Sequence, residues 1–345
     1  MAYRRRSIGR MQILHVGSSR VVHYRLVAAV IFCCSLPVPS PALAGESYPN
    51  KPVRIVCPFP PGGGADAVAR LLAEKFSARV GKPVIVDNRP GAGGTIGAEI
   101  VAKSVADGYT LLLGSSSVLA TGPALKRQRY QSLADAYSPV LLVSSIAYVL
   151  VVHPALPAKS VVELIQFAKA QPGRINYASS GIGTASHLAM ELFDDMAHVH
   201  LVHVPFKGSS LAVISLIGGQ VQAGFNNLVP ALPHIKSGRL RALGVSGPSR
   251  WPGLPEVATI AESALPGYEA LQWYGIVLPF GASRAMVDHL NREFGVILRL
   301  PEVREHLTGE GGEVAGGTPQ EFAAYMRRDV EKWSRVVQTA DIRAE

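Results

Sequence analysis

The residues best suited to chemistry in this sequence form a glycine-rich turn, Gly62 to Gly64, between an apolar strand and an amphipathic helix. Glycines leave backbone N–H groups accessible, because no Cβ stands between them and a ligand. A helix that begins directly after the turn adds the positive end of its dipole. The turn therefore predicts recognition of an anion such as a carboxylate or a phosphate, although such turns are also ordinary features of doubly wound folds.

Several other loops share this character. They are rich in Gly, Ser and Thr, poor in charge, and follow predicted strands at 58–65, 88–95, 114–117, 179–184 and 206–209. The carboxyl ends of parallel strands meet at one edge of a sheet, where α/β folds bind ligands. Neutral N–H and O–H donors suit reversible anion binding better than acid–base chemistry. We therefore predict a binding site and no catalytic residues.

Common enzyme motifs fit this chain poorly. The glycines at 91–97 have one residue too many for a dinucleotide-binding fingerprint, and no Walker lysine follows a glycine loop. No G-x-S-x-G elbow is present, and Ser179 and Ser180 lie too close to His187 to set up a nucleophile, base and orienting group. The chain is not expected to be an enzyme or to hold a cofactor.

The histidine and cysteine pattern does not predict a metal site either. On a strand His198 and His200 share one face while His203 points to the other, and no further ligand matches them. Cys57 is the one cysteine beyond the first 44 residues, and an isolated Cys in an apolar strand is typical of a small buried hydrophobe.

Residues 1–44 have the pattern of a secretory signal peptide. Arginines precede an apolar run at 26–36, prolines follow it, and an A-x-A cleavage site ends at Ala44. The run is too short to span a bilayer comfortably, and either Met1 or Met11 could be the true start. These residues hold 6 of the 34 Lys and Arg and none of the 25 Asp and Glu, which leaves 28 basic against 25 acidic residues. We expect a periplasmic protein that does not bind nucleic acid.

About 300 residues remain after the leader. This is more than a single hydrophobic core usually supports, so two lobes are expected. Strands and helices alternate over 53–114, which predicts a parallel sheet with helices on its faces. A long apolar stretch at 140–152 is predicted to be a buried strand that crosses between the lobes. The alternation then repeats, and the chain ends in predicted helices at 283–300 and 318–338.

Several blocks stand in a fixed order, among them YPNKPVRIVCPFPPGGGAD, DNRPGAGGTIGAEIV, HVPFKGS, PHIKSGRLRALGVS and the TPQEFAAYMRRDVEKW tail. Together they resemble the extracytoplasmic solute receptors of tripartite tricarboxylate transporters, the Bug family, over essentially the whole chain after the leader. The resemblance implies a two-lobed, periplasmic-binding-protein-like (Venus flytrap) α/β fold. Each lobe would be a mainly parallel sheet flanked by helices, with two crossovers. Lobe 1 would span 46–146 plus 268–345, and lobe 2 would span 147–267.

The resemblance also implies a function. The lobes would close on a small carboxylate, with a di- or tricarboxylate favoured, and a monomeric receptor would hand it to the membrane subunits of a tripartite tricarboxylate-type transporter. The alternative is an orphan receptor that senses a carboxylate and signals to a sensor kinase or another partner.

By position, the resemblance implies that the ligand meets residues from both lobes: Phe59, Pro61, Gly62, Gly63, Ser115 and Ser116 of lobe 1, and Gly183, Thr184, Phe206, Lys207 and Gly208 of lobe 2. Lys207 could face either the site or solvent. Asn226 stands where the pattern usually has Asp, which favours a ligand without an amine, unless this Asn only caps the following turn. Asp66 is expected to stabilise the first turn of its helix rather than to contact the ligand.

Overall fold

The computed structural model describes residues 48–125, 136–309 and 311–342, so the predicted signal peptide lies outside the described residues. The described strands form a ten-stranded sheet of order β2-β1-β3-β9-β4-β7-β5-β6, with β8 and β10 also paired to β4. Within this part of the chain, no helix combines the length and apolar character that crossing a membrane requires.

The elements at one end of the sheet alternate as predicted. In chain order they are β1 (Val53–Cys57), α1 (Gly64–Val80), β2 (Val84–Asn88), η1 (Ala92–Gly94), α2 (Thr95–Ala102) and β3 (Thr110–Ser115). The pairs β1–β2 and β1–β3 are parallel, which requires the helical crossovers. Helix α1 buries Val68, Leu72 and Phe76 against the sheet and ends where Gly81 adopts φ 65° as its C-cap.

A second run of alternating elements occupies the other end. In chain order they are α5 (Val161–Ala170), β5 (Asn176–Ser179), α6 (Ala185–Ala197), β6 (Val202–Pro205), α7 (Ser209–Ile217), β7 (Ala223–Asn227), α8 (Leu228–Lys236), β8 (Arg241–Val245) and α9 (Ile260–Ser263). Strand β5 pairs in parallel with both β6 and β7. Ser160 caps α5 by accepting a hydrogen bond from the Glu163 amide.

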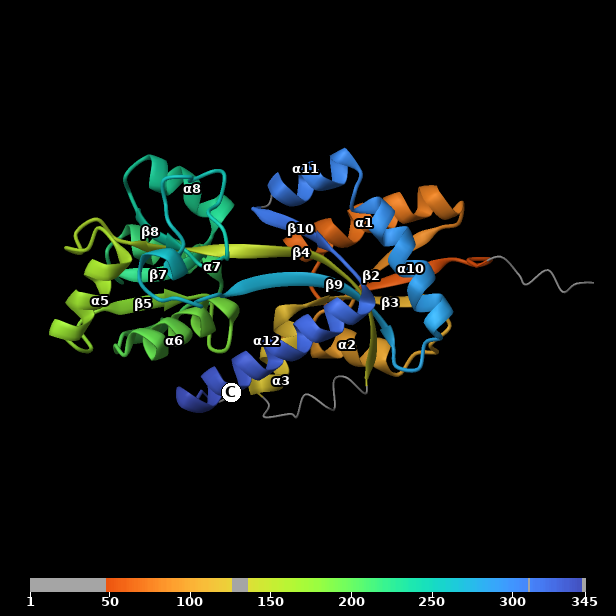
Figure 1. Ribbon diagram of the computed structural model, residues 1–345, viewed down its shortest axis with the longest axis horizontal. Helices are drawn as coiled ribbons and strands as arrows, with labels where there is room; N and C mark the ends of the chain where they lie inside the picture. Colours follow the sequence, from red (N-terminus) through yellow and green to blue (C-terminus); the bar gives the residue numbers. More distant parts are fainter. Residues whose placement is uncertain (1–47, 126–135, 310, 343–345) are drawn as a thin grey trace, which may run out of the picture. The chain divides into compact units, whose positions relative to one another are not determined.

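Two long strands, β4 (Tyr137–Val152) and β9 (Leu271–Pro279), connect these ends and lie side by side in Figure 1. The first part of β4 pairs with β9 and β10 (Gly312–Gly316), and its last residues pair with β7 and β8, all antiparallel. The predicted buried strand at 140–152 is therefore confirmed. The two-lobed α/β class is also confirmed, and antiparallel pairing in the middle of the sheet adds to the parallel pairing at its ends.

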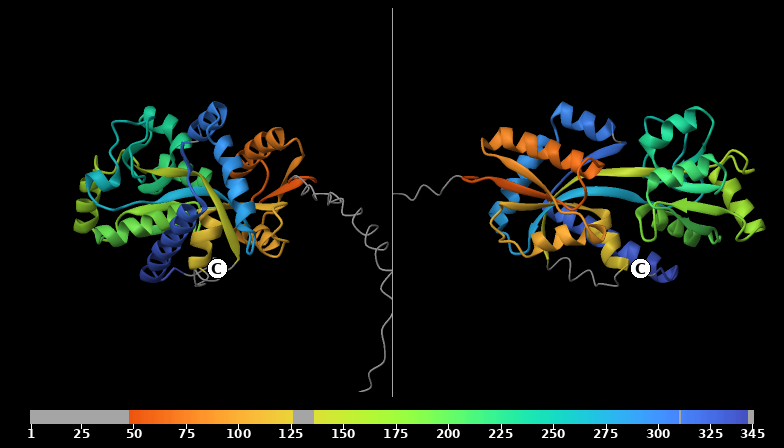
Figure 2. Two further views of the ribbon diagram at one scale, coloured as in Figure 1. Left: turned by 45° about the vertical axis from the view of Figure 1, so that its right-hand side comes forward. Right: turned by 180° about the vertical axis from the view of Figure 1, so that it is seen from behind.

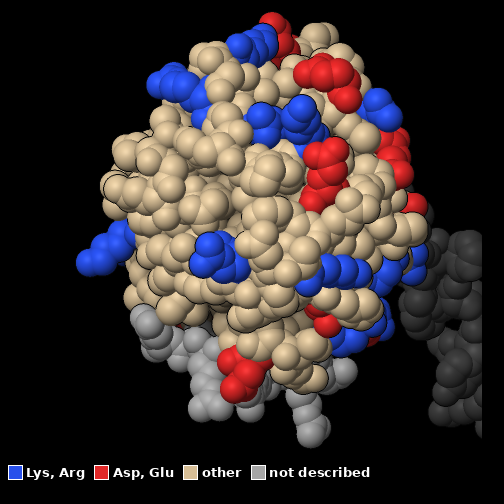
Figure 3. All heavy atoms as spheres, turned by 90° about the vertical axis from the view of Figure 1, so that its left-hand side faces the viewer, with Lys and Arg blue, Asp and Glu red and all other residues tan. Residues whose placement is uncertain are grey.

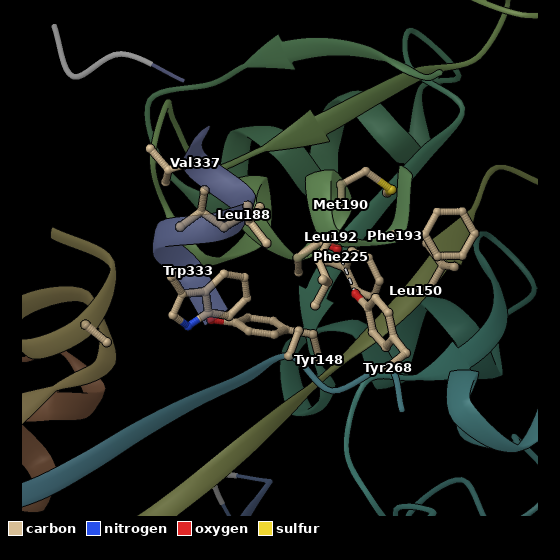
Figure 4. Packing of buried hydrophobic residues seen from close by; sticks show 14 of the residues in the cluster. Tyr148, Leu150, Leu188, Met190, Leu192, Phe193, Phe225, Tyr268, Trp333 and Val337 are labelled. Carbon is tan, nitrogen blue, oxygen red and sulfur yellow. Dashed lines mark hydrogen bonds between the residues drawn. The ribbon is translucent and has the colours of Figure 1, made fainter. Parts of the chain in front are cut away.

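The C-terminal helix α12 (Pro319–Thr339) begins at a capping box in which Thr318 and Glu321 satisfy each other's backbone amides. It packs against η2 (Ser117–Thr121) and α3 (Gly122–Leu125), and both views of Figure 2 show it beside α3. It also packs on α6, and Figure 4 shows Trp333 and Val337 beside Leu188. The apolar face of this helix is thus buried, which ties its position to both ends of the sheet.

Some boundaries differ from the sequence prediction. The helix expected over 283–300 is α10 (Arg284–Ile297), and a separate helix, α11 (Pro301–Gly309), follows it. Trp273 and Tyr274 lie within β9, a strand that the alternation did not predict. Strand β10 was also missed, because five residues containing two glycines give little strand signal.

Charge is spread thinly over the face in Figure 3, which looks onto the end that carries β5 to β8. Uncharged side chains cover most of this face, with Lys and Arg interspersed with Asp and Glu.

Candidate functional site

A cavity of about 660 Å³ lies where β1, β3, β5 and β7 end and where several helices begin. Its lining comes from the loops at 59–65, 115–117 and 184–186, together with residues of β4, β7, β9 and the start of α7. None of the described residues that line it is an Asp, Glu, Lys, Arg or His. The chemistry available is therefore that of neutral hydroxyls, amides and backbone N–H groups.

Four α-helices of the described part of the chain start at this cavity. Gly63 and Thr184 are the N-caps of α1 and α6, Asn227 is the N-cap of α8, and Ser209 is the first residue of α7; all four line the cavity. The first-turn N–H groups of a helix have no acceptor within that helix. Together with the helix dipoles they create a positive potential that suits an anion, without a charged side chain.

Asp66 organises the loop that leads into α1. Its buried carboxylate accepts hydrogen bonds of 2.9 Å from the Gly62 amide, from Asn88 Nδ2 and from Arg70 Nε. These bonds, that from Arg70 first, lower the pKa of Asp66 to about 2. The Gly62 amide, at φ 85°, is therefore directed to Asp66, and Asp66 stabilises the whole turn as well as the first turn of α1.

A cluster of serines ends β3 at the cavity. The Ser115 and Ser117 hydroxyls are 2.8 Å apart and bond to each other. The neighbouring Ser116 is 1% exposed, and among the described residues its Oγ has no hydrogen-bond partner. A buried hydroxyl without a partner is costly, so a ligand atom that bonds to it would be favoured.

A chain of three polar side chains on the long strands lines another part of the cavity. The Tyr148 hydroxyl donates to Gln272 Oε1 at 3.1 Å, and Gln272 Nε2 donates to the Tyr274 hydroxyl at 2.6 Å. Burial, followed by the nearby Tyr274, raises the pKa of Tyr148, which keeps its hydroxyl neutral. Tyr148 and Gln272 were missed because they lie within strands, away from any loop pattern.

Two hydroxyls hold the loop between β5 and α6 in place. Thr184 Oγ1 donates to the Gly181 carbonyl at 2.7 Å, and the Ser180 amide donates to Ser186 Oγ at 3.1 Å. Ser180, Thr184 and Ser186 all line the cavity. Thr184 was predicted from the sequence, and Ser180 and Ser186 were not, although the hydroxyl-rich run at 179–186 could have indicated them.

A pair of stacked histidines supports this loop from behind. The His187 and His203 rings lie 3.8 Å apart; His187 Nδ1 accepts the Gly183 amide at 2.9 Å, and His203 Nε2 lies 2.6 Å from Ser179 Oγ. Burial, followed by the nearby His187, lowers the pKa of His203 to about 4. Ser179 is itself 1% exposed and also bonds to Gly181, so this Ser–His contact is structural.

Four of the predicted site residues lie outside the cavity lining. The Gly183 amide bonds to His187, and a Cβ at Gly183 would meet Leu125 Cδ1 at 2.5 Å rather than enter the cavity. Phe206 packs at the edge of an apolar cluster, and Lys207 is exposed. Gly208 is the N-cap of α7. The other predicted residues, Phe59, Pro61, Gly62, Gly63, Ser115, Ser116, Thr184 and Asn226, line the cavity together.

The histidines near the end of α6 do not assemble a metal site. Among the described residues no three His, Cys, Asp or Glu side chains are placed to hold a metal ion. His198 is the C-cap of α6 at φ 52°, and His203 lies against Ser179. Cys57 is fully buried in the apolar cluster beneath α1, and burial raises the pKa of its thiol.

Sequence comparison connects this architecture with known proteins. The family model described as tripartite tricarboxylate transporter family receptor matches residues 68–342. The chain belongs to this family. BugT of Bordetella pertussis is 37% identical to this receptor over 315 residues, which cover 91% of the receptor and 96% of BugT.

Solved structures share the fold of the receptor. A Rhodopseudomonas palustris protein with adipate is 34% identical, with a TM-score of 0.72, and the match covers 86% of the receptor and 99% of that chain. MatC from the same species, with bound malate, is 29% identical, with a TM-score of 0.69, over 84% of the receptor and 100% of MatC. The family and these neighbours bind solutes, which agrees with the prediction that the receptor is not an enzyme.

The direction of the Asn226 side chain decides whether this residue faces the ligand or caps the following turn, the two alternatives left open by the sequence. It is 5% exposed and lines the cavity, and its Nδ2 makes a long 3.4 Å hydrogen bond to the Gly224 carbonyl two residues earlier. The cap of the following helix α8 is Asn227. The Asn226 amide therefore faces the cavity rather than capping the next turn.

Proposed function

We propose that this receptor captures a small di- or tricarboxylate in the periplasm and delivers it to the membrane subunits of a tripartite tricarboxylate-type transporter. The family description supports the transporter link. The adipate and malate in the two R. palustris structures support a carboxylate as the ligand class.

The observation that carries the proposal is a cavity without charged side chains at which four helices begin. An anion gains from helix N-termini by about 0.3–1 kcal/mol for each helix, and more where water is excluded. A cation would find no carboxylate among the described lining residues, and a purely apolar ligand would leave the cavity hydroxyls unpaired. A carboxylate is an anion that gains from the helix N-termini, and it also accepts several hydrogen bonds from the cavity hydroxyls.

We assign the two ends of the ligand to opposite sides of the cavity. One carboxylate would meet the amides at the start of α1 and the Ser116 hydroxyl. The other would meet Thr184, Ser186 and the start of α6, with ordered water bridging the remainder. The first side belongs to the proposed lobe 1, 46–146 plus 268–345, and the second side to the proposed lobe 2, 147–267. The receptor would act as a monomer, and its lobes would close on the ligand about the long strands β4 and β9.

Asn226 favours a ligand without an amine. An acidic side chain here could pair with an ammonium group, whereas the amide offers no charge to it and repels a second carboxylate less. Losing one charge-assisted hydrogen bond costs about 1.5–3 kcal/mol, or about ten- to a hundredfold in affinity. We therefore expect succinate and malate to bind more tightly than aspartate.

Calorimetry on the chain purified without its leader tests the proposal. Succinate, malate, adipate and citrate are titrated beside aspartate and glutamate, with and without chelator, and X-ray scattering follows closure. The proposal expects binding of at least one di- or tricarboxylate, a smaller radius of gyration with it, and no effect of chelator. Tighter binding of the amino acids, or binding of none of the carboxylates, would contradict it.

The proposed periplasmic location is tested separately. The A-x-A site predicts that processing ends at Ala44, so the mature chain recovered from the periplasm should begin at Gly45 by mass spectrometry. Retention of the apolar run at 26–36, or lipid on Cys33, would contradict the predicted cleavage.

A further inference from the structure

A second cavity, of about 510 Å³, adjoins the first between α7 and α8. The two cavities share Ser209, Asn226 and Asn227 in their linings. The two spaces therefore border the same three residues, and a ligand that passes them from the helix N-termini would enter the second space. We call this space the α7–α8 groove.

The walls of the α7–α8 groove are mainly apolar. Val213, Ile214 and Ile217 of α7 face Pro230 of α8 across it. Ile214 is 64% exposed, which is unusual for a large aliphatic side chain. Such walls would bury methylene groups, each of which contributes about 0.8 kcal/mol when removed from water.

The groove also carries two polar groups suited to an anion. Arg239 lines it, and the described part of the chain shows one hydrogen bond from this side chain, from Nε to Ser237 Oγ at 3.2 Å, with no carboxylate paired to it. His234 lines it as well, and its Nδ1 is buried without a hydrogen-bond partner among the described residues. An acceptor at this point would pair with Arg239, and with His234 in the tautomer that carries its proton on Nδ1.

The length of the groove limits the ligand. From Ser209 to Ile217 helix α7 rises about 12 Å, at about 1.5 Å per residue. A carbon–carbon bond of about 1.5 Å advances a zigzag chain by only about 1.3 Å, so this distance corresponds to roughly nine bonds. A chain of that length could reach from the shared lining to the far end of the groove.

We propose that the α7–α8 groove is a subsite for the methylene chain of a medium-chain α,ω-dicarboxylate, whose first carboxylate stays at the shared lining by the starts of α7 and α8 and whose second carboxylate pairs with Arg239. The inference rests on the proposed function, because the first carboxylate occupies the main cavity. It deepens that function by naming a substrate class: chains of about eight to ten carbons with an anionic group at each end.

Calorimetry with three probes tests the subsite: succinate, which is too short to reach the groove, sebacate, and decanoate, which has the same chain length but one carboxylate. The variant is Arg239→Gln, and the matched control is Lys236→Gln, which removes one nearby positive charge from α8 outside both linings. A second variant, Ile214→Ser, shortens the apolar wall. Circular dichroism verifies that each variant is folded.

The proposal expects the wild type to bind sebacate at least about tenfold more tightly than decanoate, which is the value of one charge-assisted hydrogen bond. Arg239→Gln should abolish this difference and leave succinate unchanged, Lys236→Gln should preserve it, and Ile214→Ser should weaken sebacate and decanoate alike. An unchanged sebacate-to-decanoate ratio in Arg239→Gln overturns the subsite while succinate binding still supports the proposed function. Failure of every dicarboxylate to bind overturns both.

Discussion

Removal of the Asp66 carboxylate should destabilise the fold and weaken ligand binding together. This side chain is 4% exposed and accepts three hydrogen bonds, two of them from the Gly62 amide and Asn88 Nδ2. Without it, the turn that leads into α1 loses its fixed geometry and two donors lose their acceptor.

The magnitude follows from those two bonds. At about 1.5 kcal/mol for each hydrogen bond to a charged group, Asp66→Ala should lower the free energy of unfolding by about 3 kcal/mol. The Arg70 side chain is 57% exposed, so its ion pair with Asp66 is left out of this sum. Asp66→Asn keeps one acceptor oxygen and should lose about half as much. Ordering one turn residue costs about 1–2 kcal/mol, so ligand affinity should fall about tenfold in Asp66→Ala.

Urea unfolding between pH 2 and pH 7 measures the effect, and calorimetry with the best-binding dicarboxylate measures affinity. The matched control is Asp288→Ala, because Asp288 forms an i,i+4 pair with Arg284 that is exposed. Such exposed pairs contribute about 0.3–0.5 kcal/mol. The folded-state pKa of Asp66, about 2, lies below its ordinary value. Its stabilisation is therefore present above about pH 4 and is lost as pH falls through about 2, a dependence that Asp66→Asn should lack.

Equal losses of stability in Asp66→Ala and Asp288→Ala would refute this reasoning. Unchanged ligand affinity in a destabilised Asp66→Ala would show that the carboxylate holds the fold but does not organise the binding turn.

Three further substitutions test the surroundings of the site. Burial raises the pKa of Asp194 to about 8, so the free energy of unfolding should fall as pH rises from about 4 to about 8. Thermal unfolding of Asp194→Asn should not show this fall, and the variant should be about 1–3 kcal/mol more stable than the wild type at pH 8. Gly238→Ala should lower the free energy of unfolding by about 1–2 kcal/mol, and Gly183→Ala should lower it more. Both glycines have φ near 70°, but only at Gly183 would the new Cβ meet another side chain, that of Leu125. Equal losses of stability would contradict this contact. Because His203 has a folded pKa of about 4, stability should fall as pH falls from about 6.5 to 4, and His203→Asn should flatten that part of the unfolding profile.

The sequence predicted the parts of the fold that carry periodic or capping signals. The apolar run that became β4 and the capped, striped helix α12 were recognisable because burial and helix capping leave local patterns. Strand β9 was missed, because nothing local indicates that it pairs antiparallel with β4 more than a hundred residues away. Pairing of this kind is a property of the tertiary structure.

The candidate site divides in the same way. The loops that contain Gly63, Ser116 and Thr184 were predicted from glycines and hydroxyls at strand ends, and the resemblance to the receptor family then indicated these individual residues. Tyr148 and Gln272 were missed because side chains within a strand join a cavity only through sheet twist and pairing. Lys207 could not be placed from sequence, because its direction depends on the conformation of a turn.

A pair of buried serines provides the most direct test of the central claim, that neutral donors in the main cavity bind a carboxylate. Ser116 and Ser144 are each 1% exposed, and each has an Oγ without a hydrogen-bond partner among the described residues, but of the two only Ser116 lines the cavity. Calorimetry with succinate, malate and adipate on Ser116→Ala and Ser144→Ala compares them. We predict about a tenfold or greater loss of carboxylate affinity in Ser116→Ala and wild-type affinity in Ser144→Ala. Wild-type affinity in both variants, or equal losses in both, would contradict it.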